Sequence, residues 1–541
     1  MNNQDIEAAK EYHESTKLAY INLSNKPPLY KAYSGLPEIP LPTDFTPPQT
    51  PTLEAVGSAP EIPSDPPLHM GGERLDLAEL ARLLHFSAGV LHKRQLPVAG
   101  EVHYRAAASA GALYPVEVYV VTGDIPGLEA GVYHFSPDRF TLTQLRKGDY
   151  RGELAAATGS DIAIAESPMT LAFTAVFWRS AWKYRVRSYR YCFWDAGTIL
   201  ANMLAAVRGG AGLPARLLTG FVDQEVNALL DLYSEREAAL CLTPIGIAKA
   251  ATGTETSGPI SSIKDGSGQG FEGEISYPEI IQVHAASNLA NQQEVLAWRQ
   301  AAANGGSSAP EGATNTPSSV FEDGNPRESQ PLGDAIAGRG STRRFARTNI
   351  SLSQFGAILN NSTKPLPADF LAGESVSLLD PYVIVNGVDG LEPGAYYFSL
   401  VQRRLELLKK GDFREEAGHL CFEQALGADA SAVVYFLADL DRILGQYGNR
   451  GYRAAQLEAG VMAGIAYLCA HSLGLGATGM TFYDDDVTEF FSPHAVGKSM
   501  MFLVALGKTD EVNRVRPFRS KIGVLLDSLA RGAGQRLGGS T

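Results

Sequence analysis

The chain has 541 residues, with 46 lysines and arginines against 59 aspartates and glutamates, and a formal net charge of −13. That length exceeds what one hydrophobic core usually serves, so we expect two domains. The acidic balance argues against a general binder of nucleic acid or anionic membranes, and no apolar run is long enough to suggest a membrane span. Because the start carries no basic and apolar signal regions, the sequence favours a cytoplasmic protein that acts on small molecules or folded partners.

Residues 1–73 are predicted to form an extended N-terminal arm and a proline-rich spacer. They open with a short polar helix, and prolines then follow at a density that excludes helix and most strand pairing, as in NKPPLY at 25–30 and LPEIPLP at 36–42. We expect this arm to lie on another part of the molecule.

Residues 74–250 are predicted to form the first domain. Leucines spaced between positions 75 and 84 indicate an amphipathic helix. The stretch SAGALYP at 109–115 then runs into an apolar strand at 116–121. Small residues and a glycine before a proline let backbone amides approach a flat ligand closely, although an ordinary turn before a strand has the same pattern. Further predicted elements are a hairpin-like segment at 131–136, a strand near 169–177 and a long helix from about 189 to 207.

Residues 251–334 are predicted to be a linker, because they are rich in Gly, Ser, Thr, Asn and Pro. One helical insert is expected within it, around 285–303. The second predicted domain covers 335–541, and its first amphipathic helix is expected from about Ser353.

The two domains are related by an internal repeat. GLEAGVYHFS at 127–136 recurs as GLEPGAYYFS at 390–399, a shift of 263 residues, and KGDYR at 147–151 recurs as KGDFR at 410–414. At the same shift five further residues match: Tyr184, Arg187, Tyr189, Arg190 and Gly197 align with Tyr447, Arg450, Tyr452, Arg453 and Gly460. The chain therefore holds two copies of one α+β unit, and we expect them to pack about a pseudo-twofold axis, as a homodimer would.

The two copies differ where chemistry would take place. RGSTRRF at 339–345 places two arginines around a serine, and forked guanidinium donors with a hydroxyl suit a phosphate. The corresponding place in the first half, PPLHM at 66–70, has no such cluster. Conversely, the second half has AGESVSL at 372–378 where the first has SAGALYP. Each half keeps what the other lacks, which predicts one complete site.

These residues carry a resemblance. An Arg-x-Ser-x-Arg cluster before a helix, the SAGALYP turn and GLGATG at 474–479 resemble the nitroreductase-like FMN flavoproteins. Within them the chain resembles the SagB-type dehydrogenases, azoline oxidases of peptide natural-product pathways, which YHESTK at 12–17 and PPLY at 27–30 also fit. The resemblance implies an α+β fold of two fused nitroreductase-like domains, each a mostly antiparallel sheet flanked by helices, paired within the chain as a pseudo-dimer.

The resemblance also implies that FMN lies between the two domains, and the complementary losses predict one FMN per chain. Two sets of residues would bind it. The phosphate would be held by Arg339, Ser341, Arg343, Arg514 and Arg516, and the rest of the cofactor by Ser109, Ala110, Gly111, Leu113, Gly476, Thr478 and Gly479. No basic pair follows LTPIG at 242–246 in the first half, so the opposite site is expected to be inactive.

Lys183 and Tyr184 are the catalytic pair that the resemblance implies. Removing two hydrogens from an azoline requires hydride loss to the flavin and proton loss to a base. A partly desolvated lysine, or a tyrosine beside an ammonium, can act as that base. The second half has Gln446 and Tyr447 in their place. The alternative interpretation is a surface lysine beside a packed tyrosine.

The sequence thus predicts an FMN-dependent dehydrogenase that oxidises azoline rings or a related modified-peptide intermediate. Two alternatives stay open: an NAD(P)H-dependent reductase of nitro or quinone compounds, and a non-catalytic flavin-binding scaffold in a biosynthetic complex. Expected partners are a peptide or small-molecule substrate and other biosynthetic enzymes, with no nucleic acid and no membrane. The four scattered cysteines and the lone histidines predict no metal site.

Overall fold

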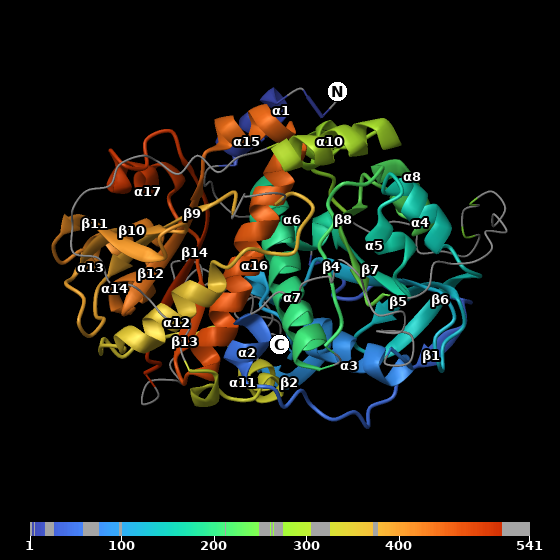
Figure 1. Ribbon diagram of the computed structural model, residues 1–541, viewed down its shortest axis with the longest axis horizontal. Helices are drawn as coiled ribbons and strands as arrows, with labels where there is room; N and C mark the ends of the chain where they lie inside the picture. Colours follow the sequence, from blue (N-terminus) through green and yellow to red (C-terminus); the bar gives the residue numbers. More distant parts are fainter. Residues whose placement is uncertain are drawn as a thin grey trace, which may run out of the picture.

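The computed structural model of the protein describes residues 3–4, 6–16, 26–57, 75–96, 100–210, 212–247, 260, 263, 274–304, 325–371 and 377–510. Two six-stranded antiparallel sheets lie at opposite ends of the molecule, and two long helices run side by side between them (Figure 1). No helix within those ranges is long and apolar enough to cross a lipid bilayer. The four cysteines are free and buried, as expected for small apolar side chains.

The first sheet belongs to the first half of the chain. Its strand order is β1 (Glu38–Pro40), β6 (Thr141–Lys147), β5 (Gly131–Ser136), β4 (Val116–Thr122), β7 (Met169–Val176) and β8 (Glu237–Ile245). The predicted apolar strand at 116–121 is β4, which is buried along its whole length, as a β-branched run between two covered faces should be. The hairpin-like segment predicted at 131–136 is β5, and it pairs with β4.

The second sheet repeats this arrangement. Its order is β11 (Arg404–Lys410), β10 (Gly394–Ser399), β9 (Asp380–Val385), β12 (Ala432–Ala438), β14 (Ser499–Gly507) and β13 (Gly476–Gly479). The sheets differ at their edges, since β13 has only isolated bridges as its counterpart in the first half, such as Ala215 with Ile245. The prolines of the arm do not exclude pairing altogether: β1 lies opposite residues 141–143 at a sheet edge, where a proline is tolerated.

The helices also occur in equivalent pairs. The pairs are α3 (Leu77–Ala88) and α12 (Leu352–Ser362), α4 (Arg151–Ala157) and α13 (Arg414–Leu420), α5 (Ile162–Ala165) and α14 (Ala425–Asp429), α6 (Phe177–Tyr184) and α15 (Leu440–Tyr447), α7 (Ser188–Gly209) and α16 (Arg450–Ser472), and α8 (Asp223–Leu229) and α17 (Asp484–Phe491). The predicted first helices of the two domains are α3 and α12, and their starts are capped by Asp76 and by a Ser351–Gln354 capping box. The long predicted helix at 189–207 is α7.

Helices α7 and α16 cross at two glycines that occupy equivalent positions in the repeat. A Cβ added to Gly197 would lie 2.4 Å from the carbonyl carbon of Gly460, and one added to Gly460 would lie 2.7 Å from the Cα of Trp194. Only glycine permits so close an approach of two backbones. Because Gly197 and Gly460 are equivalent, their meeting marks the pseudo-twofold axis.

Buried ion pairs connect the two halves symmetrically. Asp484 binds Arg187 and Arg190, and Asp223 binds Arg450 and Arg453. The four distances between guanidinium nitrogen and carboxylate oxygen lie between 2.5 and 2.8 Å. Each carboxylate contacts the arginines of the other half, which is the reciprocal pattern of a twofold interface. The predicted pairing of two α+β units within one chain is therefore confirmed.

The duplication extends further than the sequence repeat indicated. The helical insert expected at 285–303 is two helices, α9 (Pro278–Ala286) and α10 (Gln292–Asn304), with a break between them, and α9 packs against α1 (Glu7–Ser15). These helices receive equivalent arginine hydrogen bonds: Arg190 donates to His13 O and Thr16 Oγ1, and Arg453 donates to His284 O and Ser287 Oγ. Helix α9 is thus the structural equivalent of α1 in the second copy.

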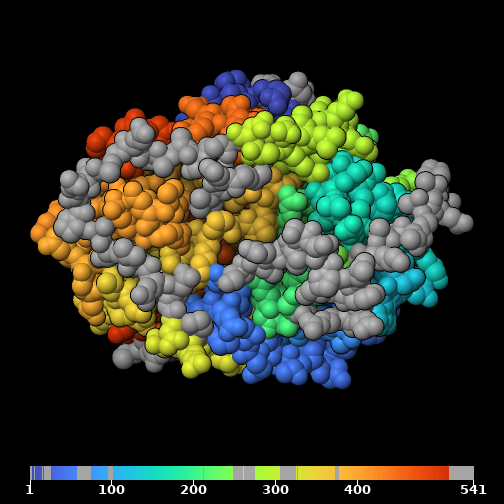
Figure 2. Space-filling view, in the orientation of Figure 1, coloured from blue at the N-terminus to red at the C-terminus, as the bar shows by residue number. Residues whose placement is uncertain are grey.

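The proline-rich spacer contains a helix that the sequence did not predict, α2 (Thr52–Gly57). Its counterpart is α11 (Leu332–Gly338), and the two starts meet, because Pro51 forms an isolated bridge with Pro331 and Thr52 N donates to Gln330 O at 3.0 Å. Helix α2 packs against α7 of the first half and against α12 and α16 of the second. On the surface, its blue segment lies between the green and the yellow parts of the chain (Figure 2).

Candidate functional site between the two halves

The 109–115 turn has a strained backbone. Its centre is a short 3₁₀ helix, Ala110–Ala112, and positive φ angles occur at Gly111 (65°), Ala112 (54°) and Tyr114 (49°). Such angles are costly outside glycine, so surrounding contacts must hold the turn. Leu113 is buried, while Gly111 at the tip is exposed.

Asp195 of α7 anchors the start of this turn. Its carboxylate accepts a hydrogen bond from Ser109 Oγ at 2.5 Å and one from the backbone N–H of Ala110 at 3.1 Å. Burial raises the pKa of Asp195 to about 7, against the lowering effect of these hydrogen bonds and of Arg105. We did not single out Asp195 from the sequence. The available signal was that the repeat aligns it with another acid, Glu458.

Two arginines connect the end of the turn to the N-terminal arm. Arg179 donates to Tyr114 O at 2.9 Å and to Pro28 O at 3.1 Å. Arg105 donates its backbone N–H to the Tyr114 hydroxyl at 3.1 Å and its guanidinium to Leu29 O at 3.1 Å. Residues 28 and 29 of the arm therefore lie on the first half and support the 109–115 turn.

The arginine–serine cluster of the second half reaches the same place. Arg339 donates from Nε to Ala106 O at 3.0 Å, three residues before the turn begins. Ser341 bridges Ala477 of β13, and its hydroxyl lies 3.2 Å from the hydroxyl of Tyr467. The predicted cluster of one half and the predicted turn of the other are thus neighbours.

The predicted residues Gly476, Thr478 and Gly479 lie on β13, directly beside that cluster. A Cβ on Gly476 would lie 2.1 Å from Thr342 Oγ1, so the strand and the cluster are in close contact. Gly479 donates its N–H to the Tyr467 hydroxyl at 2.6 Å. Tyr467 joins the two segments and was missed, because nothing in the sequence around it distinguishes it from a core residue of α16.

Lys183 and Tyr184 end helix α6 and face the tip of the turn. A Cβ on Gly111 would lie 2.7 Å from the Tyr184 hydroxyl and 2.9 Å from Lys183 Nζ. Lys183 forms no ion pair within the described part of the chain, and burial together with the nearby charge of Arg343 lowers its pKa. Burial raises the pKa of Tyr184, and Arg343 partly opposes this effect. Arg343 of the second half therefore acts electrostatically on both residues of the pair.

A run of aromatic rings joins this pair to β13. The centroids of Tyr184 and Tyr191, of Tyr191 and Trp194, and of Trp194 and Phe502 are each 4.6 Å apart. Phe502 lies against Gly479, where an added Cβ would be 2.6 Å from its ring. These aromatic rings form a continuous row between the Lys183–Tyr184 pair and β13.

The arrangement fits a planar cofactor that carries a phosphate. Guanidinium groups and a hydroxyl suit the phosphate, and the exposed backbone at Gly111 lets a flat ring approach the turn closely. Arg514 and Arg516, predicted to complete the phosphate contacts, lie outside the described residues. Every other predicted site residue lies in or beside this region.

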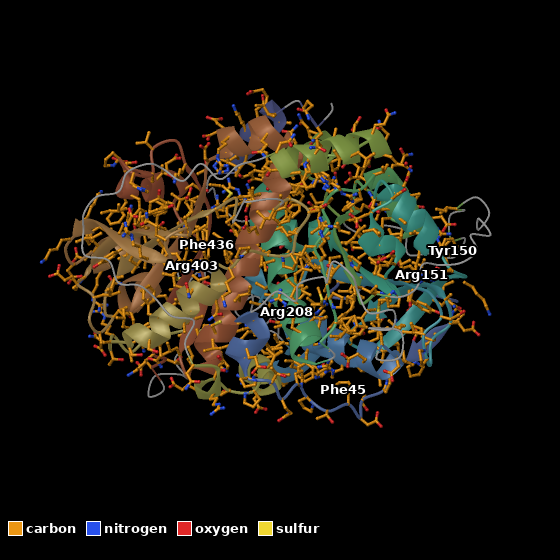
Figure 3. The ribbon with its side chains drawn as sticks, in the orientation of Figure 1. Phe45, Tyr150, Arg151, Arg208, Arg403 and Phe436 are labelled. Atoms are coloured by element: carbon orange, nitrogen blue, oxygen red, sulfur yellow. The ribbon has the colours of Figure 1, made fainter. Side chains whose placement is uncertain are left out.

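The equivalent place on the other side of the axis is built differently. Lys364 donates to Gly57 O, and Arg208, labelled near the middle of the molecule in Figure 3, lies 3.5 Å from Val56 O, so both cations face the last carbonyls of α2. The cavity beside them has a volume of about 20 Å³, which holds roughly one water. Leu204 lines it at the repeat position of Tyr467. The segments 66–70 and 372–376 lie outside the described residues.

Curated relatives resemble parts of the chain. A protein of Methanocaldococcus jannaschii with a nitroreductase name is 31% identical over 173 residues, which are 32% of this chain and 81% of that protein. The trifolitoxin-processing protein TfxB of Rhizobium leguminosarum bv. trifolii is 34% identical over 25% of this chain and 37% of its own length. The microcin B17-processing protein McbC of Escherichia coli is 28% identical over 26% and 52%.

A solved structure resembles nearly the whole chain. A protein from Anabaena variabilis, described as a nitroreductase, superposes with a TM-score of 0.70 at 26% identity, and the match covers 93% of this chain and 99% of that one. The family model described as "Nitroreductase family" matches residues 72–247 and again residues 336–508. With two matching domains over most of its length, and with the peptide-processing TfxB and McbC among its relatives, the chain belongs to the nitroreductase family as a tandem protein of SagB-type resemblance.

Proposed function

We propose that the protein is an FMN-dependent oxidoreductase with one flavin site per chain, built from both halves. One observation carries the proposal: Arg339 and Ser341 of the second half lie against the segment that leads into the 109–115 turn of the first. In this assignment Arg339, Ser341 and Arg343, with Arg514 and Arg516, hold the phosphate end. Ser109, Ala110, Gly111 and Leu113 cover the ring, and β13 closes the site.

Bound FMN supplies a two-electron acceptor. Lys183 and Tyr184 are the proposed acid–base pair, and Lys183 is the better candidate for the base. Its lowered pKa makes a neutral amine available nearer neutral pH, whereas the raised pKa of Tyr184 keeps the phenol protonated and able to donate a hydrogen bond.

The proposed substrate is a heterocycle-bearing or otherwise modified peptide, oxidised by loss of two hydrogens. The peptide-processing names of TfxB and McbC support this class. The names of the relatives from M. jannaschii and A. variabilis favour the second candidate, NAD(P)H-dependent reduction of nitro or quinone compounds. Rapid bleaching of the bound flavin by NADPH would favour the reductase, and conversion of a thiazoline-bearing peptide to the thiazole-bearing peptide would favour the dehydrogenase. Flavin binding without either reaction would favour the non-catalytic scaffold.

The test of the site is the amount of flavin bound. We expect one FMN released per chain on denaturation of the reconstituted protein, and almost none from the Arg339→Ala, Arg343→Ala double variant. Each charge-assisted hydrogen bond to the phosphate contributes roughly 1.5–3 kcal/mol, so losing two arginines lowers affinity by orders of magnitude. The matched control is Arg208→Ala with Lys364→Ala, the two cations on the other side of the axis, which should leave the ratio unchanged. A ratio near two would contradict the single asymmetric site.

A further inference from the structure

Two buried carboxyl groups occupy equivalent positions on the central helices. Asp195 of α7 is 5% exposed and Glu458 of α16 is fully buried, and within the described ranges neither forms an ion pair with a cation. Each instead accepts a hydrogen bond from a backbone N–H of the segment before a central strand. Asp195 accepts from Ala110, before β4, and Glu458 accepts from Leu378, before β9, at 2.9 Å. Burying a carboxyl group without a cationic partner is costly, and these hydrogen bonds offset part of that cost.

The contacts of Asp195 fix both ends of the 109–115 turn. At the start, the carboxylate binds Ser109 Oγ and the N–H of Ala110. At the end, the N–H of Tyr114 donates to the same Ser109 Oγ at 2.8 Å, so one hydroxyl links the carboxylate to both sides of the strained residues. Thr198, one helical turn after Asp195, adds a bond from its hydroxyl to Ala108 O at 2.7 Å.

We propose that Asp195 is a positioning residue that holds the 109–115 turn in its flavin-binding conformation, and that Glu458 has no such role in flavin binding. This inference rests on the proposed function. Asp195 acts through Ser109 and Ala110, which would cover the cofactor, and through the tip residue Gly111 it keeps Lys183 and Tyr184 in place.

The same contacts make flavin binding sensitive to the proton on Asp195. The titratable groups that face this carboxyl are Arg105, Tyr114, Tyr184 and Cys192, and of these only Arg105 is cationic. Burial holds the pKa of Asp195 at about 7, and the negative charge of an FMN phosphate bound at this site would disfavour the ionised carboxylate further. The protonated form should therefore bind FMN more tightly, so affinity should fall as pH rises through neutrality.

The test compares FMN dissociation constants, measured by quenching of flavin fluorescence, for the full chain and three variants. Asp195→Ala should weaken binding about tenfold or more, because it removes two hydrogen bonds. Asp195→Asn should bind within about threefold of wild type at pH 6, since its amide can accept from Ala110 N and donate to Ser109 Oγ. Between about pH 6 and pH 8 the affinity of the wild type should fall and that of Asp195→Asn should not. Glu458→Gln should bind like the wild type.

Several outcomes would overturn this inference. Wild-type affinity in Asp195→Ala would show that the turn does not depend on the carboxyl. An equal loss in Glu458→Gln would show general destabilisation, and an unchanged pH dependence in Asp195→Asn would remove the role of the proton. If Asp195→Ala does not fold, Ser109→Ala breaks the same link from the other side, and wild-type affinity there would count equally against the proposal. A wild-type protein that binds no FMN would overturn the proposed function, and this inference with it.

Discussion

Lys183 ends a helix with its ammonium group partly buried and close to the charge of Arg343. Both effects favour the neutral amine, which is the form that a base requires. We predict that Lys183→Ala and Tyr184→Phe lower turnover of the flavin-loaded protein by about 10²-fold or more, the range typical of acid–base residues, while bound flavin stays near one per chain. The matched control is Tyr447→Phe, at the repeat position of Tyr184, which should turn over at the normal rate.

The pH dependence of turnover provides a second measurement on the same pair. If Lys183 is the base, activity should rise with pH as the amine loses its proton. Replacing Arg343 by glutamine removes a positive charge that lowers the pKa of Lys183, so the pKa rises and the rising limb moves to higher pH. Turnover should be followed at saturating FMN, because Arg343 also belongs to the proposed phosphate contacts. A limb that stays in place, or moves to lower pH, would contradict Lys183 as the base.

The 109–115 turn has a glycine at its tip, Gly111. Gly111 has a φ of 65°, and a side chain there would collide with Lys183 and Tyr184. We predict that Gly111→Ala reduces FMN affinity at least about tenfold. It should also destabilise the fold, because the left-handed backbone conformation at this position costs an alanine roughly 1–2 kcal/mol. Gly212 has nearly the same φ, 63°, with no atom within 4 Å of an added Cβ. Gly212→Ala should show the stability loss alone in urea unfolding, and an equal effect of both variants on flavin would contradict the collision.

The N-terminal arm is anchored to the first sheet by a buried ion pair. Lys31 Nζ lies 2.6 Å from Glu237 Oε2 and donates to the Tyr119 hydroxyl at 2.8 Å. Burial alone would lower the pKa of Lys31, but Glu237 raises it. Lys31→Met should destabilise the protein by about 3–5 kcal/mol in urea unfolding, because it leaves a buried carboxylate without its cation.

Two further variants test that explanation. Adding Glu237→Gln to Lys31→Met should recover much of the lost stability, since no unpaired charge then remains. The control is Lys147→Met, whose partner Glu129 is exposed, and it should change the unfolding midpoint little. A double variant no more stable than Lys31→Met alone would argue that the arm is held by packing and not by the charge pair.

How far the sequence predicts these elements depends on where their stability comes from. Strands β4 and β5 and helix α7 have strong apolar patterns of their own, and the bounds predicted from the sequence agree with the observed ones to within two residues. Helix α2 is six residues long and is stabilised by contacts with both halves, so its local sequence does not predict it. Helices α1 and α9 share a histidine, His13 and His284, whose backbone carbonyl binds an arginine, and a hydroxyl residue three positions later, Thr16 or Ser287, binds the same arginine. One histidine and one hydroxyl residue are too short a pattern to reveal the relation from the sequence.

At the scale of the whole molecule, the two halves share one buried interface. We predict that a protease site inserted between residues 305 and 313 can be cut without separating the halves, which should elute together in size-exclusion chromatography with flavin still bound. Combining the cut with Asp484→Ala and Asp223→Ala should separate them, because each change leaves two arginines buried without their carboxylate. Halves that part after the cut alone would contradict an interface of this strength.

The crossing of α7 and α16 has a consequence for how the two sites can change. In a homodimer one codon specifies both copies of a residue, so a substitution that improves one site alters its twin as well. Here the partners that meet at the axis, Gly197 and Gly460, are encoded separately, and so are Tyr467 and Leu204 or Asp195 and Glu458. One copy can therefore specialise for an anionic ligand while the other carries different side chains at the equivalent positions. The fused chain retains the geometry of a dimer without its obligation to be symmetric.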